Sequence, residues 1–379
     1  MSEAVHLLTH EFRPYTGGIG VYVEELAGAL SRIDVLTTVW APSYNELQTD
    51  DFPFKVNRIE MSGKQGWGCR MRFAKALMLA FPDKRIPGTV VLAEPGPIRL
   101  WMYASSLGLP KPDRLVVILH GSEVQLQSKL WHRKHLFRKL LLKADAVGAV
   151  SQRVRASISK VCPEITADIV CVPGAVRHAW QILPPVRERN NLDNRQIIQV
   201  GRVHPRKGQD VLVEAVGRLP SPLKESVEVR FIGPVVKSAY RDRISSRAGE
   251  LGIKVVFEGT IPELAVRRAY ESAALCVMPS QPYKTSVEGL GLALLEAQHF
   301  GCPVIGANTG GIDEALRNRE SGLLFPPGDA QALADAIKRI LTDSEMANSL
   351  GREGSLFVRG SFSWERNVRQ LGLVRLNKV

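Results

Sequence analysis

Two glutamates near the C-terminal end of the chain, Glu288 and Glu296, are separated by seven residues. Two glycines follow the first acid, and the run predicts a helix from about Leu290, after an apolar strand that ends at Pro279-Ser280. The unpaired N–H groups at the start of such a helix attract an anion. This arrangement suits a nucleotide sugar, with one acid for the ribose and one for the transferred sugar. The alternative is a buried helix with a surface acid at each end, but Glu296 interrupts an apolar face and needs a partner if it is buried.

A second group of chemistry-bearing residues forms a short basic loop after the apolar run Ile197–Val200. The loop begins at Gly201 and carries Arg202, Arg206 and Lys207 just before a predicted helix. Cations are unfavourable at the positive end of a helix dipole, so a bound anion would compensate them. A diphosphate leaving group fits this description, and a solvated basic loop is the alternative.

Two further strand ends carry candidate site residues. Gly17-Gly18-Ile19 opens a helix after the first predicted strand, and His120 directly follows the apolar run Leu115–Leu119. Ligands of open parallel sheets lie at the carboxyl ends of strands, so both places are candidate ligand contacts. The alternatives are a glycine-rich turn without a ligand and a structural histidine whose hydrogen bonds are made internally.

The elements that must position these residues alternate along the whole chain. Short β-branched runs alternate with amphipathic stretches such as Val21–Leu30 and Ala330–Leu341, which predicts parallel sheets covered by helices on both faces. The strands are predicted near Val5–Thr9, Val35–Trp40, Val56–Met61, Val90–Ala93, Leu115–Leu119, Ala146–Val150, Ile169–Val172, Ile197–Val200, Val227–Ile232, Lys254–Phe257, Leu275–Met278, Pro303–Gly306 and Leu323–Phe325. The fold class is therefore α/β, with two doubly wound, Rossmann-like domains expected to face a central cleft: residues 1–180, a linker over 181–195 and residues 196–360, followed by a last helix over 361–379.

Composition limits the classes of protein and partner. The 379 residues are 45% hydrophobic and 23% charged, with a net charge of +12, which calls for an anionic partner. The five scattered cysteines do not suggest a disulfide framework or a zinc site. The N-terminus looks like a first strand rather than a signal peptide, and no apolar run reaches the ~20 residues of a membrane span. A cytoplasmic protein, peripheral on the inner membrane face at most, is expected.

The positive charge is concentrated in two segments of the first half, Lys55–Arg85 and Lys129–Lys143. The second mixes cations with Trp131, Phe137 and leucines, a pattern typical of helices at membrane surfaces. An anionic membrane is therefore a candidate partner, and the alternative is an ordinary helix with its leucines on the sheet. Nucleic acid is not expected, because no nucleic-acid motif is present.

Taken together, these motifs resemble one family, the retaining GT-B glycosyltransferases of family 4. The resemblance follows the order Gly17-Gly18-Ile19, His120-Gly121, Gly201-Arg202, Lys207-Gly208, Pro279-Ser280, Glu288-x7-Glu296, Gly301-x-Pro303-Val304-Ile305 and Gly310-Gly311, and it covers roughly residues 1–365. The sequence around His120, Lys207 and Glu288 is most similar to the phosphatidylinositol-mannoside mannosyltransferase branch. The resemblance also implies that the last helix, over 361–379, crosses back to the first domain.

The resemblance implies a role for each matching residue. Arg202 and Lys207 would neutralise the departing diphosphate, Glu296 would bind the ribose, Glu288 would lie near the donor sugar's hydroxyls, and His120 would face that sugar. The other implied contacts are Gly17, Gly18 and Ile19 on the acceptor side and Gly18, Gly201, Thr260, Ile261, Gly289, Leu290, Gly291 and Leu292 on the donor side. No Asp-x-Asp triplet occurs in the sequence, so no metal or other cofactor is expected.

The implied reaction moves a hexose from GDP-mannose or a UDP-sugar to a lipid-linked, polysaccharide or small-molecule acceptor, with retention of configuration. Other functions remain open on the sequence alone: a catalytically silent nucleotide-sugar-binding protein, or a nucleotide-sugar epimerase of the same fold. A glycoside hydrolase is disfavoured, because it needs two carboxylates that flank the scissile bond.

Overall fold

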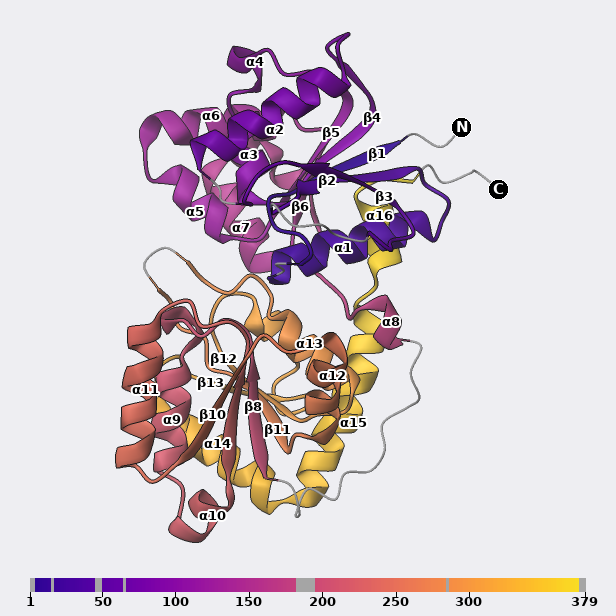
Figure 1. Cartoon of the computed structure of the whole chain (residues 1–379). Coiled ribbons are helices and arrows are strands. Elements are labelled where there is room, and N and C mark those ends of the chain that lie inside the picture. Colours follow the sequence, from indigo (N-terminus) through magenta and orange to yellow (C-terminus); the bar gives the residue numbers. More distant parts are fainter. Residues whose placement is uncertain are drawn as a thin grey trace. The chain divides into compact units, whose positions relative to one another are not determined.

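The computed structural model describes residues 4–14, 17–44, 50–63, 66–181, 195–283 and 286–374. The chain forms two compact units, Met1–Gly174 with Ser363–Val379, and Ala175–Phe362 (Figure 1). The boundary between them falls slightly before the predicted end of the first domain at residue 180. The predicted linker lies almost wholly outside the described residues, since 182–194 are not described.

The first unit is built on a seven-stranded parallel sheet with the order β3-β2-β1-β4-β5-β6-β7. Its strands are β1 (Val5–Leu8), β2 (Thr37–Pro42), β3 (Lys55–Ile59), β4 (Arg85–Leu92), β5 (Lys111–Leu119), β6 (Ala146–Ala149) and β7 (Ile169–Cys171). Every residue of β2 is buried, as expected for a parallel sheet covered on both faces. The predicted strands of this half are all present and agree within about two residues at their ends, except that β4 and β5 begin at Arg85 and Lys111, well before the predicted starts at Val90 and Leu115.

Helices connect these strands and cover the sheet. Those of at least seven residues are α1 (Gly18–Ser31), α2 (Trp67–Ala80), α3 (Pro95–Trp101), α5 (Ser122–Ser128), α6 (Trp131–Lys143), α7 (Gln152–Val161) and α16 (Trp364–Gln370). The last of them returns from the far end of the chain to α1. The Trp364 ring packs edge-on against Tyr22 with centroids 4.9 Å apart, and Arg32 pairs with Glu365 at 3.1 Å.

The second unit contains a six-stranded parallel sheet with the order β10-β9-β8-β11-β12-β13. Its strands are β8 (Gln196–Val200), β9 (Glu228–Ile232), β10 (Lys254–Gly259), β11 (Leu275–Met278), β12 (Val304–Ala307) and β13 (Leu323–Phe325). Both sheets therefore have the doubly wound order that the alternating pattern predicts.

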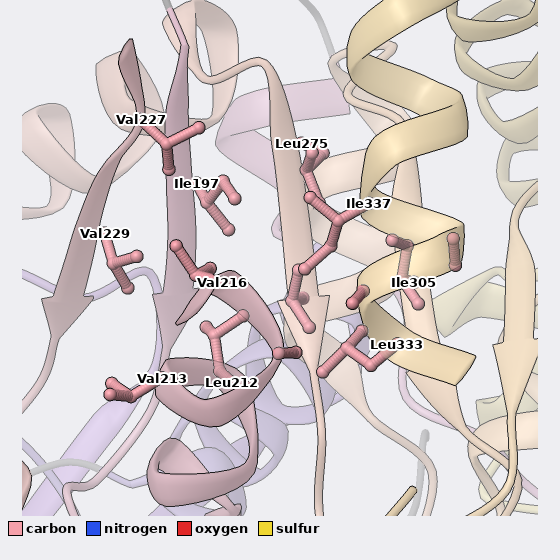
Figure 2. Close-up of a cluster of buried hydrophobic side chains, with 14 of the residues drawn as sticks. Ile197, Leu212, Val213, Val216, Val227, Val229, Leu275, Ile305, Leu333 and Ile337 are labelled. Atoms are coloured by element: carbon pink, nitrogen blue, oxygen red, sulfur yellow. The ribbon is translucent and has the colours of Figure 1, made fainter. Parts of the chain in front are cut away.

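Helices cover both faces of the second sheet. They are α9 (Gln209–Gly217), α10 (Ser221–Ser226), α11 (Ser238–Glu250), α12 (Glu263–Ser272), α13 (Leu292–His299), α14 (Ala330–Thr342) and α15 (Ser344–Ser361). Successive residues of β8 point to opposite faces, so Ile197 joins one apolar cluster and Ile198 the other. Figure 2 shows the first cluster, in which Leu212 and Val216 of α9 and Leu333 and Ile337 of α14 pack on the strands.

Two negative findings apply to the described part of the chain. No helix there is long and apolar enough to cross a membrane. In the same residues, no group of three or more His, Cys, Asp or Glu side chains is placed to hold a metal ion. None of the five cysteines, all of which are described, forms a disulfide.

Candidate active site

The second sheet has its topological switch point between β8 and β11. From β8 the chain continues outward through β9 and β10, whereas β11 is followed by β12 and β13 on the other side. The loops after β8 and β11 therefore diverge, and ligands bind at such a point. The two loops touch closely: a side chain at Gly208 would place its Cβ 1.9 Å from the Pro279 carbonyl oxygen, and the Gln281 N–H donates to the Arg206 carbonyl at 2.8 Å.

Glu288 lies at the centre of this junction. One of its carboxylate oxygens, Oε2, accepts a hydrogen bond from Lys207 Nζ at 2.8 Å and from Arg206 Nη1 at 3.0 Å. Ser280 Oγ donates to the same oxygen at 3.4 Å. The three charged side chains are 12–14% exposed, so this is a largely buried ion-pair network and not a surface acid.

The charges at this junction do not balance. Burial opposes the ionised form of Glu288, but Lys207 and Arg206 outweigh it and lower its pKa to about 2. Burial also lowers the pKa of Lys207, against the attraction of Glu288. We assign the proton to Lys207, because a carboxyl group with a pKa near 2 is ionised at neutral pH. Three cations, counting the nearby Arg202, then surround a single anion.

Arg202 differs from the other two cations of the loop. Its side chain is exposed, and it makes no ion pair with any residue that the structure describes. The two predicted phosphate-binding cations, Arg202 and Lys207, therefore differ in their surroundings. Lys207 forms an ion pair with Glu288, whereas the Arg202 side chain is exposed to solvent. Arg206, a cation of the basic loop to which the sequence analysis assigned no role, forms the second ion pair with Glu288.

The basic loop is held in shape by side chains around it. Gln199 donates to the Lys207 carbonyl at 2.7 Å, and Gln209 donates to the Arg202 carbonyl at 3.1 Å. Gly201 has a φ of +140°, a backbone conformation that favours glycine. Backbone and buried amides thus fix the loop, so its cations are preorganised.

The first acid is fixed by the backbone of the loop after β12. Gly310 has a φ of +63°, and a Cβ there would lie 2.1 Å from the Glu288 carbonyl oxygen. That oxygen accepts the Gly311 N–H at 3.0 Å. The predicted Gly310-Gly311 pair thus allows a close backbone approach that positions Glu288.

The helix after Glu288 begins at Leu292, two residues after the predicted start at Leu290. Gly291 has a φ of +101° and is therefore outside the helix, while Leu290 is buried beneath it. The N–H groups of Leu292 and Ala293 find no backbone acceptor in the residues that the structure describes, as is usual for a first helical turn. The segment from Gly289 to Leu292, which contains four predicted donor contacts, thus connects Glu288 to the first turn of α13. The N–H groups of that turn are available to a ligand.

Glu296, in the middle of α13, belongs to a different group of side chains. Tyr270 Oη donates to Glu296 Oε2 at 2.9 Å, and Arg177 Nε lies 3.8 Å from Oε1. Its side chain is 12% exposed, and burial raises its pKa while Arg177 and Tyr270 lower it. The partner that a buried Glu296 requires is thus Tyr270, a residue that no sequence signal indicated.

Thr260 and Ile261 follow β10 at the same edge of the sheet. The Gly259 carbonyl accepts the Gly233 N–H at 2.8 Å, which ties the ends of β10 and β9 together. Thr260 is exposed, and Ile261 packs on the second apolar cluster. The predicted donor contacts of this unit therefore come from the carboxyl ends of three strands, β8, β10 and β11, and from α13.

The first unit has its own switch point, between β1 and β4. Gly17, Gly18 and Ile19 form the start of α1 after β1, and Gly18 is exposed. No sequence pattern indicated His10 and Glu94, which follow the ends of these two strands, are buried, and place His10 Nδ1 3.3 Å from Glu94 Oε2. Glu94 also accepts the Gly96 N–H at 3.1 Å and so caps α3.

His120 stands at the end of β5, the next strand of the first sheet. Its Nε2 lies 3.0 Å from the Ala93 carbonyl oxygen, which can only accept, so Nε2 carries the hydrogen. Burial lowers the pKa of the ring, so it is neutral at pH 7. Nδ1 is then an acceptor, with no partner among the described residues. Tyr22 packs edge-on at 5.0 Å. His120 thus has both a structural contact and one nitrogen left for a hydroxyl.

Comparison with protein families assigns both halves of the chain. Residues 16–180 match the model described as Glycosyltransferase Family 4, and residues 185–356 match the model described as Glycosyl transferases group 1. The chain therefore belongs to the glycosyltransferases that combine these two domains. Its fold class, two parallel-sheet α/β domains of the GT-B type, is confirmed.

Individual relatives are similar over nearly the whole chain. The GDP-mannose-dependent alpha-(1-6)-phosphatidylinositol monomannoside mannosyltransferase of Mycolicibacterium smegmatis is 28% identical over 382 residues, which is 96% of each chain. Among solved structures, the sucrose-phosphate synthase of Thermosynechococcus elongatus has a TM-score of 0.79 at 24% identity and covers 98% of this chain and 97% of its own. The HepE protein of Anabaena, solved with UDP and glucose, has a TM-score of 0.77 at 17% identity, with 98% of each chain covered. The structures show the shared fold. The family models and the relatives show that the protein is a hexosyltransferase.

Proposed function

We propose that this glycosyltransferase moves a hexose from a nucleotide sugar to its acceptor with retention of configuration and without a metal ion. One observation carries the proposal: Lys207, Arg206 and Glu288 meet at the switch point of the second sheet, and the nearby Arg202 forms no ion pair with a described residue. An excess of preorganised positive charge at a ligand-binding edge suits a diphosphate.

In the proposed reaction the anomeric carbon–oxygen bond to the diphosphate breaks, and the charge that develops on the leaving phosphate is the main barrier to lower. Lys207 and Arg202 would stabilise that charge, as would the open N–H groups of α13. Glu288 would contact hydroxyls of the transferred sugar while it holds Lys207 in place. An acceptor hydroxyl would attack from the face that the diphosphate leaves, with an oxocarbenium-like transition state between them, and would pass its proton to the departing phosphate oxygen.

The remaining predicted residues take supporting parts in this proposal. Glu296 would bind the ribose hydroxyls, and Thr260 and Ile261 would lie near the base. His120 would offer its free Nδ1 to a hydroxyl of the transferred sugar, while Gly17, Gly18 and Ile19 shape the acceptor side. A neutral histidine suits this part, because it can accept a hydrogen bond without adding positive charge near the oxocarbenium ion.

For the donor, we propose GDP-mannose first and a UDP-sugar second. The M. smegmatis relative is named as GDP-mannose-dependent and resembles this chain along almost its full length, which supports the first choice. The same relative acts on a phosphatidylinositol monomannoside by name, and this supports a lipid-linked glycan as the acceptor.

A thermal-shift screen with GDP, UDP, ADP and their sugars tests the proposal. A nucleotide at 100 times its dissociation constant stabilises the folded protein by about 2.7 kcal/mol, and we expect this shift for one base, with EDTA as well as with magnesium. Transfer to an acceptor followed by NMR of the product's anomeric centre then tests retention. Binding without turnover would indicate a catalytically silent protein, and a shift that requires magnesium would contradict the metal-independent mechanism.

We further propose that the first unit contacts an anionic membrane through α6 and α2, so that the protein acts on the cytoplasmic face. In α6, Phe137, Leu140 and Leu141 are buried. One face of the helix therefore packs inward, as in an ordinary helix that covers a sheet. Its exposed residues include the cations Lys139 and Lys143 and, at its first position, Trp131, which is 83% exposed. Such a mixture of exposed aromatic and basic side chains favours a lipid interface.

Flotation with vesicles tests this surface. Vesicles containing phosphatidylglycerol should retain the protein at low salt, pure phosphatidylcholine vesicles should not, and 0.5 M salt should release it because the attraction is screened. The variant Trp131→Ala with Lys139→Glu and Lys143→Glu should lose retention, whereas Lys254→Glu, an exposed cation of the other unit, serves as a control. Equal retention of all variants would contradict the membrane surface.

A further inference from the structure

We infer that Tyr270 and Arg177 are positioning residues that orient Glu296 and direct its oxygen Oε1 to the ribose of the nucleotide. This inference rests on the proposed function, in which Glu296 binds that ribose. It adds two residues that neither the predicted motif nor the basic loop contains.

Tyr270 is well suited to orient a carboxylate. It lies near the end of α12 and its side chain is completely buried. Its ring stacks on Phe300 with centroids 6.3 Å apart and meets Trp180 edge-on at 6.2 Å. This packing holds the hydroxyl in place, 2.9 Å from Glu296 Oε2. A buried tyrosine requires a hydrogen-bond partner, and here that partner is the acid.

Arg177 contributes charge without a hydrogen bond to the acid. Its Nε is 3.8 Å from Glu296 Oε1, and its Nη1 is 3.4 Å from Glu263 Oε2. Its guanidinium lies over the Trp180 ring, 5.3 Å from the centroid. At 3.8 Å the contact with Glu296 is electrostatic only, so Oε1 has no hydrogen-bond donor among the residues that the structure describes. The two oxygens are thus unequal: Tyr270 occupies Oε2, and Oε1 can accept from a ligand.

The groups around Glu296 shift its pKa in opposite directions. The titratable and charged groups that face it are Arg177, Glu263 and Tyr270, with Cys276 of β11 behind them. Only Arg177 is a cation, and burial raises the pKa of Glu296. Ribose hydroxyls donate hydrogen bonds best to an ionised acceptor. Loss of the Tyr270 hydroxyl should therefore weaken ribose binding twice, through lost orientation and through a higher pKa of the acid.

The experiment compares a nucleotide with and without its ribose hydroxyls. The probe is whichever of GDP, UDP and ADP gives the largest thermal stabilisation, together with its 2′,3′-dideoxy form, and the dissociation constants are measured by calorimetry from pH 5 to pH 8. In the unmodified protein the ribose form should bind at least 10-fold more tightly. In Tyr270→Phe this preference should fall about 10-fold, since a hydrogen bond to a charged group is worth about 1.5 kcal/mol or more.

The pH dependence gives an independent readout. The preference for ribose should be lost as Glu296 becomes protonated at low pH, and in Tyr270→Phe this loss should begin at a higher pH. Tyr240→Phe is a matched control, because Tyr240 is also buried and also donates to an acid of this unit, Asp210 Oδ1 at 2.8 Å. It should leave the ribose preference unchanged.

Two further variants separate failure of this inference from failure of the proposed function. Glu296→Gln should abolish the ribose preference, and Tyr270→Phe should then have no added effect in that background. If Glu296→Gln removes the preference but Tyr270→Phe keeps it in full, the positioning role is wrong and the donor role of Glu296 stands. If Glu296→Gln itself keeps the preference, the donor role fails. Arg177→Gln, which should reduce the preference in the same direction, replaces Tyr270→Phe if that variant does not fold.

Discussion

Lys207→Ala is the substitution that tests the site most directly. Lys207 Nζ is 2.8 Å from Glu288, its side chain is 12% exposed, and its backbone carbonyl is held by Gln199. The ammonium is therefore both buried and preorganised. Its removal should affect catalysis and stability by different amounts, and this difference makes the test informative.

The catalytic effect follows from the loss of one preorganised donor at the departing diphosphate. Such a loss costs about 10²- to 10³-fold in turnover, or about 2.7–4 kcal/mol of transition-state stabilisation. The effect on stability should be smaller. Truncating one partner of a buried ion pair costs about 3–5 kcal/mol when the other charge is left alone, but here Glu288 keeps Arg206 at 3.0 Å and Ser280 at 3.4 Å. We expect roughly 2 kcal/mol, or a melting point about 5 °C lower.

The assay measures release of the nucleoside diphosphate with saturating donor, alongside the melting point of each variant. Arg206→Ala is the matched control, because Arg206 contacts the same oxygen of Glu288 but is not expected to touch the diphosphate. Lys207→Ala should therefore lose much more turnover than Arg206→Ala for a similar loss of stability. A folded Lys207→Ala protein with near-normal turnover would refute the reasoning, and equal losses in both variants would show that the two cations act only through Glu288.

Three further outcomes are expected. Glu296→Ala should weaken the affinity for the nucleoside diphosphate about 10-fold or more, because it removes a charged acceptor for ribose hydroxyls; an unchanged dissociation constant by calorimetry would be inconsistent with that role. Glu288→Gln should be less stable than the unmodified protein by at most about 3 kcal/mol near pH 7, because the pKa of Glu288 is about 2 when folded against a model value of 4.5. A depressed pKa stabilises the protein above pH 4.5, so the difference in melting point should shrink as the pH falls from 4.5 towards 2, and a difference that stays constant would argue against the pKa shift. Gly310→Ala should lower stability by about 2 kcal/mol, because φ is +63° and the new Cβ would lie 2.1 Å from the Glu288 carbonyl oxygen; Gly249→Ala, at the end of α11 with open space around its Cβ, should be neutral, and equal melting points for the two would contradict the steric argument.

The contacts of Glu288 explain why a site proposed to bind a diphosphate contains an acid. Glu288 repels a phosphate, yet it binds Lys207 and Arg206 within hydrogen-bond distance and so orders two side chains that would otherwise repel each other. A ligand that arrives with hydroxyl groups can share the acid, and its phosphate can use the cations. The network can therefore recognise a sugar joined to a diphosphate better than either part alone.

Local sequence patterns were sufficient for the elements of the fold. Runs such as Ile197–Val200 and Leu115–Leu119 are apolar and β-branched, and each alternates with a helical stretch of suitable length, so strand order within a doubly wound sheet follows from connection rules. The start of α13 was placed too early, because Gly291 adopts a left-handed conformation that a hydrophobic pattern does not reveal. Residue types at strand ends also indicated Lys207, Glu288 and Glu296, since buried acids and clustered cations carry a cost that only a ligand or a partner offsets.

Only the tertiary structure decided which of these charged residues meet. Arg206 and not Arg202 shares Glu288 with Lys207, because Arg206 and Lys207 both lie in the short helical turn Pro205–Lys207 and spacing along the chain does not fix that turn. Tyr270 and Arg177 are far from Glu296 in sequence, on α12 and before α8 (His178–Gln181), and nothing in their neighbours marks them as partners of an acid. The pairing depends on how α12 and α13 pack on the sheet, a long-range packing result that local residue patterns do not encode.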